Sequence, residues 1–304
     1  MHQAQVTAWN HAPQYAKVPE PPAPSAEEIR IKVAAAGLHR VVRSRASGQH
    51  YSSGPLPHVP GIDGVGTTED GKSVYFSSMS LGTMTEYLNV PKRAVVPMPE
   101  ELDPIQAAGM INPAMSSWMA FTARTSELKK GCTALILGAT SASGRLAIPI
   151  ARSLGASKII GAARNSKAME ELGLDEQVII ANDPARTDFS KAEDVDVVVD
   201  YVGGPLATSL LSSIKTQRPV DYVHVGSLSG VLDVTVPGAA LRSKDIAIRG
   251  SGPGAWSMSV VLKEMPAILE ALKSVPKQPV KVVKLAEVEK EWNKENAERV
   301  VVVP

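Results

Sequence analysis

Residues 135–164 read LILGATSASGRLAIPIARSLGASKIIGAAR. The stretch begins with an apolar run, passes through a loop of small residues from Gly138 to Gly144, and continues as a helix-like segment. A second apolar run, Lys158 to Ala163, ends at Arg164. This order predicts a βαβ unit whose loop lies against the helix N-terminus. Free backbone N–H groups and the positive end of the helix dipole suit a phosphate there, so we predict a dinucleotide site.

The loop departs from the usual dinucleotide pattern at its centre. Gly138 and Gly144 stand at the ends of a G-x-x-G-x-x-G frame, but Ser141 and Ala142 occupy the middle. A glycine-rich turn alone is weak support, and an ordinary βα connection in any α/β domain is the alternative. Pro149 interrupts the helix-like segment, and a proline there predicts a kink or a late helix start.

Composition limits the possible partners. A chain of 304 residues is long for one hydrophobic core and comfortable as two domains. Hydrophobic residues make up 44% and charged residues 21%, as in globular proteins. Because 32 Lys and Arg nearly balance 31 Asp and Glu, we expect neither nucleic acid nor an anionic membrane as a partner.

The single cysteine, Cys132, excludes an internal disulfide and a cysteine zinc cluster. It follows Gly131 at the start of an apolar run, and we expect a buried, inert thiol rather than a catalytic one. The N-terminus has no basic segment followed by an apolar one, and no apolar run approaches membrane-spanning length. We therefore expect a cytoplasmic protein.

The first 98 residues read as short strands separated by turns. Strand-like runs occupy residues 6–9, 29–33, 61–68, 73–76 and 83–90. A proline-rich connection, residues 18–24, cannot enter a central strand. We predict a small irregular β domain or barrel. A helix follows from Leu102 to about Ala123, with Asp103 as N-cap and Pro104 at its first position.

The remaining chain predicts an α/β domain and a short return. Apolar runs at residues 178–181, 195–201, 220–226 and 245–249 add to the two of the opening unit, which gives six strands. Their lack of alternation is typical of parallel strands covered on both faces, so we predict a doubly wound sheet with a ligand crevice at the strand C-termini. Beyond Met258 we expect a helix, a strand at 279–284, a helix near 286–296 and a strand at 300–303, the strands returning to the first domain.

Eight stretches carry a resemblance to a known family over nearly the whole chain. They are AAAGLH (34–39), SGQHY (47–51), LPHVPGIDGVG (56–66), AGMINPAMSSW (108–118), GATSASG (138–144), VVVDYVGG (197–204), VHVGSLSG (223–230) and ERVVVVP (298–304). The sequence resembles the medium-chain dehydrogenase/reductase superfamily, in its zinc-independent quinone oxidoreductase branch, which includes zeta-crystallin. This implies a GroES-like catalytic domain at 1–112 and 257–304 and a Rossmann domain at 113–256.

The resemblance also implies that the protein works without zinc. Zinc alcohol dehydrogenases of this superfamily carry a cysteine shortly after the strand where this chain has Gly37-Leu-His39, and a G-H-E motif where it has Gly61-Ile62-Asp63. Neither ligand position is kept, so hydride chemistry is left to the cofactor and to hydrogen bonds. Three further positions differ from relatives: His39 replaces asparagine, Met115 replaces threonine, and Ser141-Ala142 replaces two glycines.

Two residues are candidates for catalysis, Tyr51 and His39, because both lie in loops that line the cleft beside the nicotinamide in the resembling family. Reduction of a conjugated carbon creates negative charge on a distant oxygen, which needs donors and a proton. A tyrosine in this loop is the proposed proton donor of related enoyl reductases, although His50 competes with Tyr51 for that alignment. The alternatives are a rim tyrosine on a surface loop and a structural histidine.

The end of the second strand predicts NADPH rather than NADH. NAD sites carry a carboxylate about 20 residues past the glycine loop, whereas this chain has Arg164 and Lys167, which suit a 2′-phosphate. The cofactor-binding residues implied by the loop and the resemblance are Asn112, Met115, Gly138, Thr140, Ser141, Ala142, Ser143, Gly144, Arg164, Asn165, Lys167, Val202, Gly226, Ser227, Leu228 and Ser251.

Two classes of function remain open. The first is an NADPH-dependent reductase of a quinone or another electron-poor enone, and within this class enoyl thioester reduction is the alternative. The second is a non-catalytic NADPH-binding sensor or structural protein. Arg40, Arg43 and Arg45 fit an anionic coenzyme A thioester or, more simply, a solvated helix face. We also expect a homodimer that pairs along the strand at 245–249, as relatives do.

Overall fold

The computed structural model describes residues 1–294 and 298–304. The packing of the chain divides it into two compact units, Met1–Asn112 with Leu262–Pro304, and Pro113–Val261. The sequence predicts the first of these boundaries after residue 112 and the second after residue 256. The helix α7 (Met258–Lys273) begins in one unit and ends in the other, so the second boundary falls within it.

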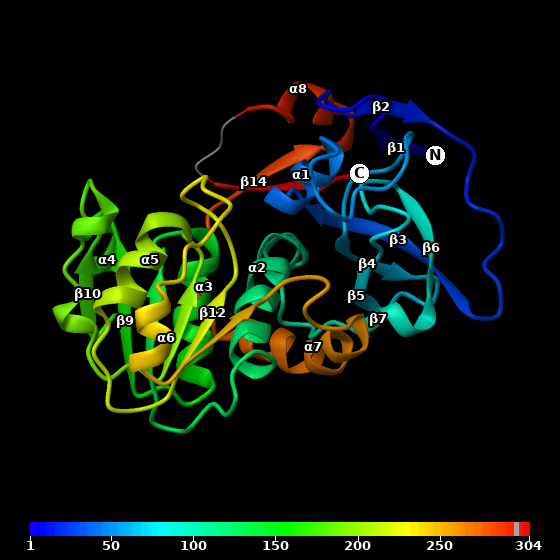
Figure 1. Cartoon of the computed structure of the whole chain (residues 1–304). Coiled ribbons are helices and arrows are strands. Elements are labelled where there is room, and N and C mark those ends of the chain that lie inside the picture. Colours follow the sequence, from blue (N-terminus) through cyan, green and yellow to red (C-terminus); the bar gives the residue numbers. More distant parts are fainter. Residues whose placement is uncertain (295–297) are drawn as a thin grey trace. The chain divides into compact units, whose positions relative to one another are not determined.

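A parallel sheet forms the centre of the second unit. In the described chain its strands are β8 (Thr133–Leu137), β9 (Lys158–Ala163), β10 (Glu176–Ile179), β11 (Val197–Asp200), β12 (Val220–His224) and β13 (Ile246–Gly250), coloured green to yellow in Figure 1. They lie in the order β10-β9-β8-β11-β12-β13, and every neighbouring pair is parallel. The predicted doubly wound sheet is confirmed, and the strand order reverses between β8 and β11, where such folds bind ligands.

Helices cover the faces of this sheet. They are α3 (Ala142–Ser153), α4 (Ser166–Glu170), α5 (Gly204–Ser213) and α6 (Gly238–Ser243), with the 3-10 turns η2 (Pro184–Arg186) and η3 (Ser190–Ala192). Leu206 and Leu210 of α5 share one apolar cluster with Leu135 and Val198 of the sheet. All of β11 is buried, which explains why its sequence does not alternate.

Of the two effects expected of Pro149, a kink or a late helix start, the late start is wrong. Helix α3 begins at Ala142 and contains Pro149 in its interior. The missing N–H of Pro149 would have bonded to the carbonyl of Arg145, one turn earlier. The side chain of Ser141 caps the helix by accepting from the N–H of Gly144, which stabilises the first turn before the proline is reached.

The first unit is a mainly antiparallel β structure. Its described strands are β1 (His2–Gln5), β2 (Gln14–Lys17), β3 (Glu28–Gly37), β4 (Asp63–Thr68), β5 (Ser73–Ser77), β6 (Tyr87–Pro91), β7 (Val95–Pro97), β14 (Val280–Lys284) and β15 (Arg299–Val303). The main sheet runs β14-β15-β3-β4-β5-β7, with β6 also paired to β3, while β1 pairs with β2. Because β15 pairs with β3, the predicted return of the C-terminal strands to the first domain is confirmed.

Two local predictions in this unit are wrong. The first strand lies at His2–Gln5 rather than at residues 6–9, because Val6 bonds to His58 and the chain turns at Asn10, whose φ is 60°. The helix expected near 286–296 is shorter: η4 (Leu285–Glu287) leads into α8 (Val288–Glu291). The end of that predicted helix falls outside the described residues.

One helix of the first unit, α1 (Arg40–Ala46), lies where the sequence was interpreted as short strands and turns, so that prediction is wrong there, and η1 (Lys92–Ala94) is a further short helical turn. The predicted helix from Leu102 to about Ala123 is confirmed as α2 (Pro104–Thr122), which begins in the first unit and ends in the second. Asp103 caps α2, because its Oδ1 accepts from the N–H of Gln106 at 2.8 Å. None of the described helices combines the length and the apolar character that crossing a membrane requires.

Candidate active site

The glycine loop between β8 and α3 is packed so closely that only backbone atoms fit at its glycines. Gly138 has a φ of +86°, a conformation that other residues rarely adopt. A Cβ on Gly144 would lie 2.2 Å from the carbonyl oxygen of Gly138 and 2.8 Å from the Cα of Ala139. Glycine at 144 therefore allows the helix to start against the end of the strand, as a phosphate loop requires.

The loop also leaves N–H groups for an anion. Ser141 Oγ accepts the N–H of Gly144 at 3.0 Å, so the cap takes one of the donors at the helix start. Ala142 and Ser143 occupy the first two helical positions, where an N–H has no intrahelical acceptor. Together with the helix dipole, these two groups fit the pyrophosphate of a dinucleotide.

At the end of β9 the cationic side chains face outward. Arg164 and Lys167 are both exposed, and no hydrogen bond or ion pair joins either side chain to a described residue. Asn165 caps α4, since its Oδ1 accepts from the N–H of Ala168 at 3.0 Å. The position that carries a carboxylate in NAD sites is thus occupied here by an arginine, a group that matches a 2′-phosphate.

Next to the glycine loop, the segment after β12 lies beside the end of β11. A Cβ on Gly138 would be 3.1 Å from Val202 Cγ2 and 3.5 Å from Leu228 Cδ1. The N–H of Leu228 donates to the carbonyl of Tyr201 at 2.9 Å, which holds the segment in place. The structure thus gathers Gly138, Val202 and the Gly226-Ser227-Leu228 segment at one edge of the sheet.

The side chain of Ser117 connects α2 with Tyr201, which follows β11, and with Ser143 at the start of α3. Its Oγ lies 2.7 Å from the hydroxyl of Tyr201 and 3.2 Å from the carbonyl oxygen of Ser143. Both Ser117 and Tyr201 are buried, and burial raises the pKa of the tyrosine. Met115, two residues earlier, is buried, and Asn112 is half-buried one turn before Ser117.

The remaining two predicted residues make backbone or side-chain contacts within the second unit. The carbonyl of Thr140 accepts from Nε of Arg145 at 3.1 Å. Ser251, just after β13, donates its N–H to the carbonyl of His224 at 2.8 Å, and its Oγ accepts from the indole of Trp256 at 3.2 Å.

Asp200 was missed by the sequence reasoning. It ends β11 and is fully buried, yet its carboxylate accepts four hydrogen bonds: from the N–H groups of Val202 and Gly203, the hydroxyl of Tyr222 and Nδ1 of His224. These bonds fix the turn from β11 into α5, and Val202 lies in this turn. A carboxylate at the end of an otherwise apolar strand was the available signal, in the stretch VVVDYVGG.

In the first unit, His39 and Asp63 form a buried pair. His39 is the N-cap residue of α1 and is 2% exposed, and Asp63 begins β4 and is 4% exposed. Imidazole Nε2 lies 3.5 Å from Asp63 Oδ1. Neither ring nitrogen of His39, nor this carboxylate oxygen, has a hydrogen-bond partner among the described residues. The sequence reasoning had noted Asp63 only as a changed zinc position.

Tyr75 and Arg299 complete the surroundings of Asp63. The hydroxyl of Tyr75 donates to Asp63 Oδ2 at 3.4 Å. Burial and the charge of Asp63 raise the pKa of Tyr75. Burial lowers the pKa of Arg299 to about 10, although the negative charge of Asp63 opposes this shift. Asp63 is therefore a buried acid that accepts a hydrogen bond from the phenol of Tyr75 and interacts electrostatically with Arg299.

Tyr51 lies on the surface and is 74% exposed. Its ring packs on His50, with 4.1 Å between the ring centroids. His50 Nδ1 accepts the N–H of Ser52 at 3.2 Å, so this nitrogen is unprotonated. Burial and the charge of Arg45 lower the pKa of His50. Both residues that competed in the sequence therefore lie on the same loop, Tyr51 exposed and His50 partly buried beside it.

The arginines of α1 have mainly structural contacts. Arg45 donates to the carbonyls of Ser52 at 3.1 Å and Met79 at 2.7 Å, which anchors the Tyr51 loop. The guanidinium of Arg43 lies 5.5 Å from the ring centroid of Trp292. Arg40 is exposed. Two of the three cations are thus neither fully solvated nor free to bind an anionic thioester.

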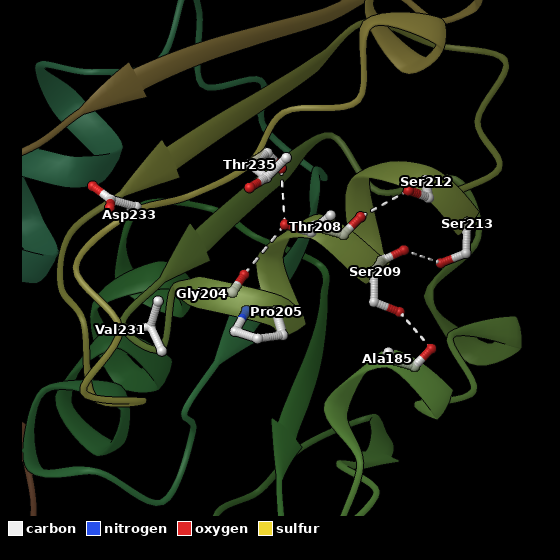
Figure 2. A pocket seen from close by; sticks show the side chains of 10 residues that line it. All are labelled: Ala185, Gly204, Pro205, Thr208, Ser209, Ser212, Ser213, Val231, Asp233 and Thr235. Atoms are coloured by element: carbon white, nitrogen blue, oxygen red, sulfur yellow. Dashed lines mark hydrogen bonds between the residues drawn. The ribbon is translucent and has the colours of Figure 1, made fainter.

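A separate cavity lies on the outer face of α5. It encloses about 710 Å³ between α5, η2 and the segment 231–235. Figure 2 shows that its hydroxyls point back to the protein: Thr208 donates to the carbonyl of Thr235 at 2.8 Å, and Ser209 donates to that of Ala185 at 3.3 Å. Asp233 is the charged residue in its lining.

Metal ligands do not gather in the structure. Within residues 1–294 and 298–304, no group of three or more His, Cys, Asp or Glu side chains is arranged to hold a metal ion. Cys132 is buried, and burial raises the pKa of its thiol.

Comparison with known proteins places these features in a family. No family model matches the chain. The protein named "Probable NADPH-dependent quinone reductase tdiC" of Emericella nidulans is 36% identical over 356 residues, with 100% of both chains covered. The chloroplastic NADPH-dependent alkenal/one oxidoreductase of Arabidopsis thaliana is 29% identical over 200 residues, which covers 58% of this chain and 50% of the relative.

Solved structures show the same fold. The quinone oxidoreductase of Thermus thermophilus, whose crystal structures include a complex with NADPH, gives a TM-score of 0.78 at 23% identity, with 100% of both chains covered. The parallel sheet, its glycine loop and the full-length similarity to the fungal relative lead to one conclusion. The chain belongs to the quinone oxidoreductase family of the medium-chain dehydrogenase/reductase superfamily.

Proposed function

We propose that the protein is an NADPH-dependent reductase that transfers hydride to a quinone or another electron-poor enone. The observation that carries this proposal is the glycine loop with Arg164, not a carboxylate, at the end of the next strand. The names of the relatives, an NADPH-dependent quinone reductase and an NADPH-dependent alkenal/one oxidoreductase, support both the cofactor and the substrate class.

The chain's own groups fit the cofactor at three points. The N–H groups of Ala142 and Ser143 would hold the pyrophosphate, and Arg164 with Lys167 would hold the 2′-phosphate. Val202 and the segment 226–228 lie on the opposite side of the glycine loop. When bound, NADPH supplies the hydride. We assign the other predicted residues to the same site.

Charge develops on the substrate during reduction, and we assign its stabilisation to His39 and Tyr51. A quinone or enone that accepts hydride at carbon gains negative charge on oxygen, which hydrogen-bond donors stabilise. An enone also needs a proton at carbon, and Tyr51 supplies it in this proposal. Burial and the charge of Arg45 lower the pKa of His50, which disfavours the protonated form of that neighbour.

We further propose that the reaction needs no zinc and that the protein is a homodimer. The two zinc motifs of alcohol dehydrogenases are replaced here by His39 and by Ile62-Asp63. Strand β13 ends the parallel sheet, and Ile248 on it is 36% exposed. An open apolar edge of this kind favours pairing with a second copy.

Turnover tests the proposal against its alternatives. Purified protein is mixed with NADPH and, separately, a benzoquinone, a small enone and a crotonyl thioester, and the near-ultraviolet absorbance of NADPH is followed. We expect oxidation with the quinone and the enone. Oxidation with the thioester alone would identify an enoyl thioester reductase. NADPH binding without oxidation in any mixture would identify a non-catalytic NADPH-binding protein.

A further inference from the structure

Arg145 carries a permanent positive charge in the first turn of α3, three residues after Ala142, where this helix begins. The positive end of the helix dipole disfavours a cation at this place. Within residues 1–294 and 298–304 no carboxylate pairs with Arg145, and its side chain makes one hydrogen bond, from Nε to the carbonyl of Thr140 at 3.1 Å. The position of this cation is therefore not explained by the chain's own acids.

The side chain of Arg145 runs back toward the glycine loop. Side chains on a helix lean toward its N-terminus, and here Nε reaches Thr140, which precedes the capping residue Ser141. Arg145 is half-buried. Nε is engaged, whereas the four N–H bonds of Nη1 and Nη2 have no acceptor in the part of the chain that the structure describes. The guanidinium is thus anchored beside the loop with most of its donors unused.

Thr140 lies next to the end of β9. The N–H of Ala139 donates to the carbonyl of Ala162 at 3.1 Å, which fastens the loop to this strand. Ala162 stands two positions before Arg164, the residue that follows β9. Because Thr140 directly follows Ala139, the guanidinium that bonds to Thr140 is held at the same corner of the parallel sheet as Arg164.

Three cations therefore belong to this corner, Arg145 on α3 and Arg164 and Lys167 at the end of β9. No ion pair joins any of the three to another described residue. Cations that share a corner without a carboxylate of their own suit an anion with more than one charge. The contrast lies within the same unit, where each of four other arginines pairs with an aspartate: Arg152, Arg186, Arg218 and Arg249.

We propose that Arg145 is a further contact to the 2′-phosphate of NADPH, beside Arg164 and Lys167, and that it helps to determine the preference for this cofactor. A guanidinium with Nη1 and Nη2 unused can hold two phosphate oxygens side by side, which an ammonium group cannot do. NADH carries a hydroxyl in place of this phosphate and offers Arg145 no charge. The inference rests on the proposed function and adds a residue to its cofactor specificity.

The test compares ligand affinities of full-length variants. Kd is measured for NADPH and NADH, and for adenosine 2′,5′-bisphosphate and AMP, which differ in the same phosphate but lack the nicotinamide. Arg145→Ala should weaken binding of NADPH and of the bisphosphate about tenfold. This is near the lower end of what one charged hydrogen bond contributes, because Arg145 is only half-buried. Binding of NADH and AMP should change less than about twofold.

Two further variants separate contact with the phosphate from support of the loop. Arg145→Lys keeps the charge and loses the fork, so it should recover part of the NADPH affinity lost in Arg145→Ala. Arg152→Ala is the matched control on the same helix, since its guanidinium pairs with Asp175, and it should leave the ratio of the two cofactor affinities unchanged. Loss of the bond to Thr140 alone would disturb the loop for both cofactors alike.

Three results would overturn the inference. They are equal weakening of NADPH and NADH in Arg145→Ala, which would indicate loop support or contact with the pyrophosphate, an unchanged Kd for NADPH, or Arg145→Lys as weak as Arg145→Ala. If Arg145→Ala does not fold, as judged by thermal unfolding, Arg145→Gln provides the same comparison.

Failure of the proposed function is distinct, because it appears in the wild-type protein. Wild-type protein that binds NADPH but oxidises it with none of the substrates would contradict the proposed reaction and leave the affinities to decide the role of Arg145. Equal Kd values of wild-type protein for NADPH and NADH would overturn the cofactor preference and this inference together.

Discussion

A Cβ on Gly144 would lie 2.2 Å from the carbonyl oxygen of Gly138, so the glycine loop closes on its own backbone. Gly144→Ala must push α3 away from β8. Overpacking of this kind costs about 1–3 kcal/mol of unfolding free energy. It should also displace the N–H groups of Ala142 and Ser143, which we propose hold the pyrophosphate, and so lower NADPH affinity. Thermal unfolding and NADPH titration measure both effects.

Gly54→Ala is the matched control for this substitution, because a Cβ there meets no atom within 4 Å. We expect Gly54→Ala to leave stability and NADPH affinity near the wild-type values. Equal behaviour of the two variants would show that close packing at Gly144 has no part in binding.

Arg164→Ala should weaken NADPH binding about 10- to 100-fold and leave NADH binding nearly unchanged. A charged hydrogen bond contributes about 1.5–3 kcal/mol, and about 1.4 kcal/mol corresponds to a factor of ten. Titration of both cofactors against both proteins measures this. Arg186→Ala removes another exposed arginine of the same unit, paired with Asp183, and should change neither affinity. A similar loss for NADH would argue against contact with the 2′-phosphate.

Tyr51→Phe should separate the two substrate classes. If Tyr51 protonates the carbon of a reduced enone, its loss lowers enone turnover by about 10²–10⁴-fold. Quinone turnover should change little, since solvent can protonate hydroquinone oxygens. Tyr15→Phe, at another exposed tyrosine, is the control. Loss of quinone reduction with intact enone reduction would contradict the assignment.

Removal of metal should have no effect on turnover. This prediction follows from the proposed zinc-independent reaction, since the two zinc motifs of alcohol dehydrogenases are replaced here by His39 and by Ile62-Asp63. Incubation with a strong chelator followed by desalting should therefore preserve kcat, and added zinc should not raise it. Reversible inactivation that zinc restores would show that His39 and Asp63 have been misinterpreted.

Strand β13 should carry the dimer contact. We expect wild-type protein to sediment as a dimer at micromolar concentration and Ile248→Lys to shift it toward monomer, because a charge at a pairing edge opposes association. Ile179→Lys makes the same change on β10, at the opposite edge of the sheet, where Ile179 is 48% exposed. The Ile179→Lys variant should sediment as wild-type protein does. Wild-type monomer alone would exclude the dimer.

Much of the fold was predictable from local sequence patterns. Strand β9 spans the predicted residues 158–163, since an apolar run bounded by a turn residue and a cation defines it. The return of β15 to β3 followed from the order of strands. The position of β1 was not predictable, because Val6, the residue after it, bonds to the distant His58.

The polar contacts of the site were harder to predict from the sequence. Ser117 and Tyr201 are 84 positions apart in sequence, and only the packed fold brings their hydroxyls within 2.7 Å. His39 and Asp63 lie at the ends of β3 and β4, whose register shifts between Val33 and Ala35. An irregular register cannot be read from alternation, so the pair was invisible until the strands were placed.

A single-turnover experiment tests the central claim most directly. Protein saturated with NADPH is mixed with one equivalent of benzoquinone without oxygen, and NADPH absorbance and hydroquinone are measured together, with NADH in a parallel mixture. The account predicts one hydroquinone formed for each NADPH consumed, and NADH bound and used more weakly. NADPH that stays bound and unoxidised, or equal binding and use of NADH, would contradict it.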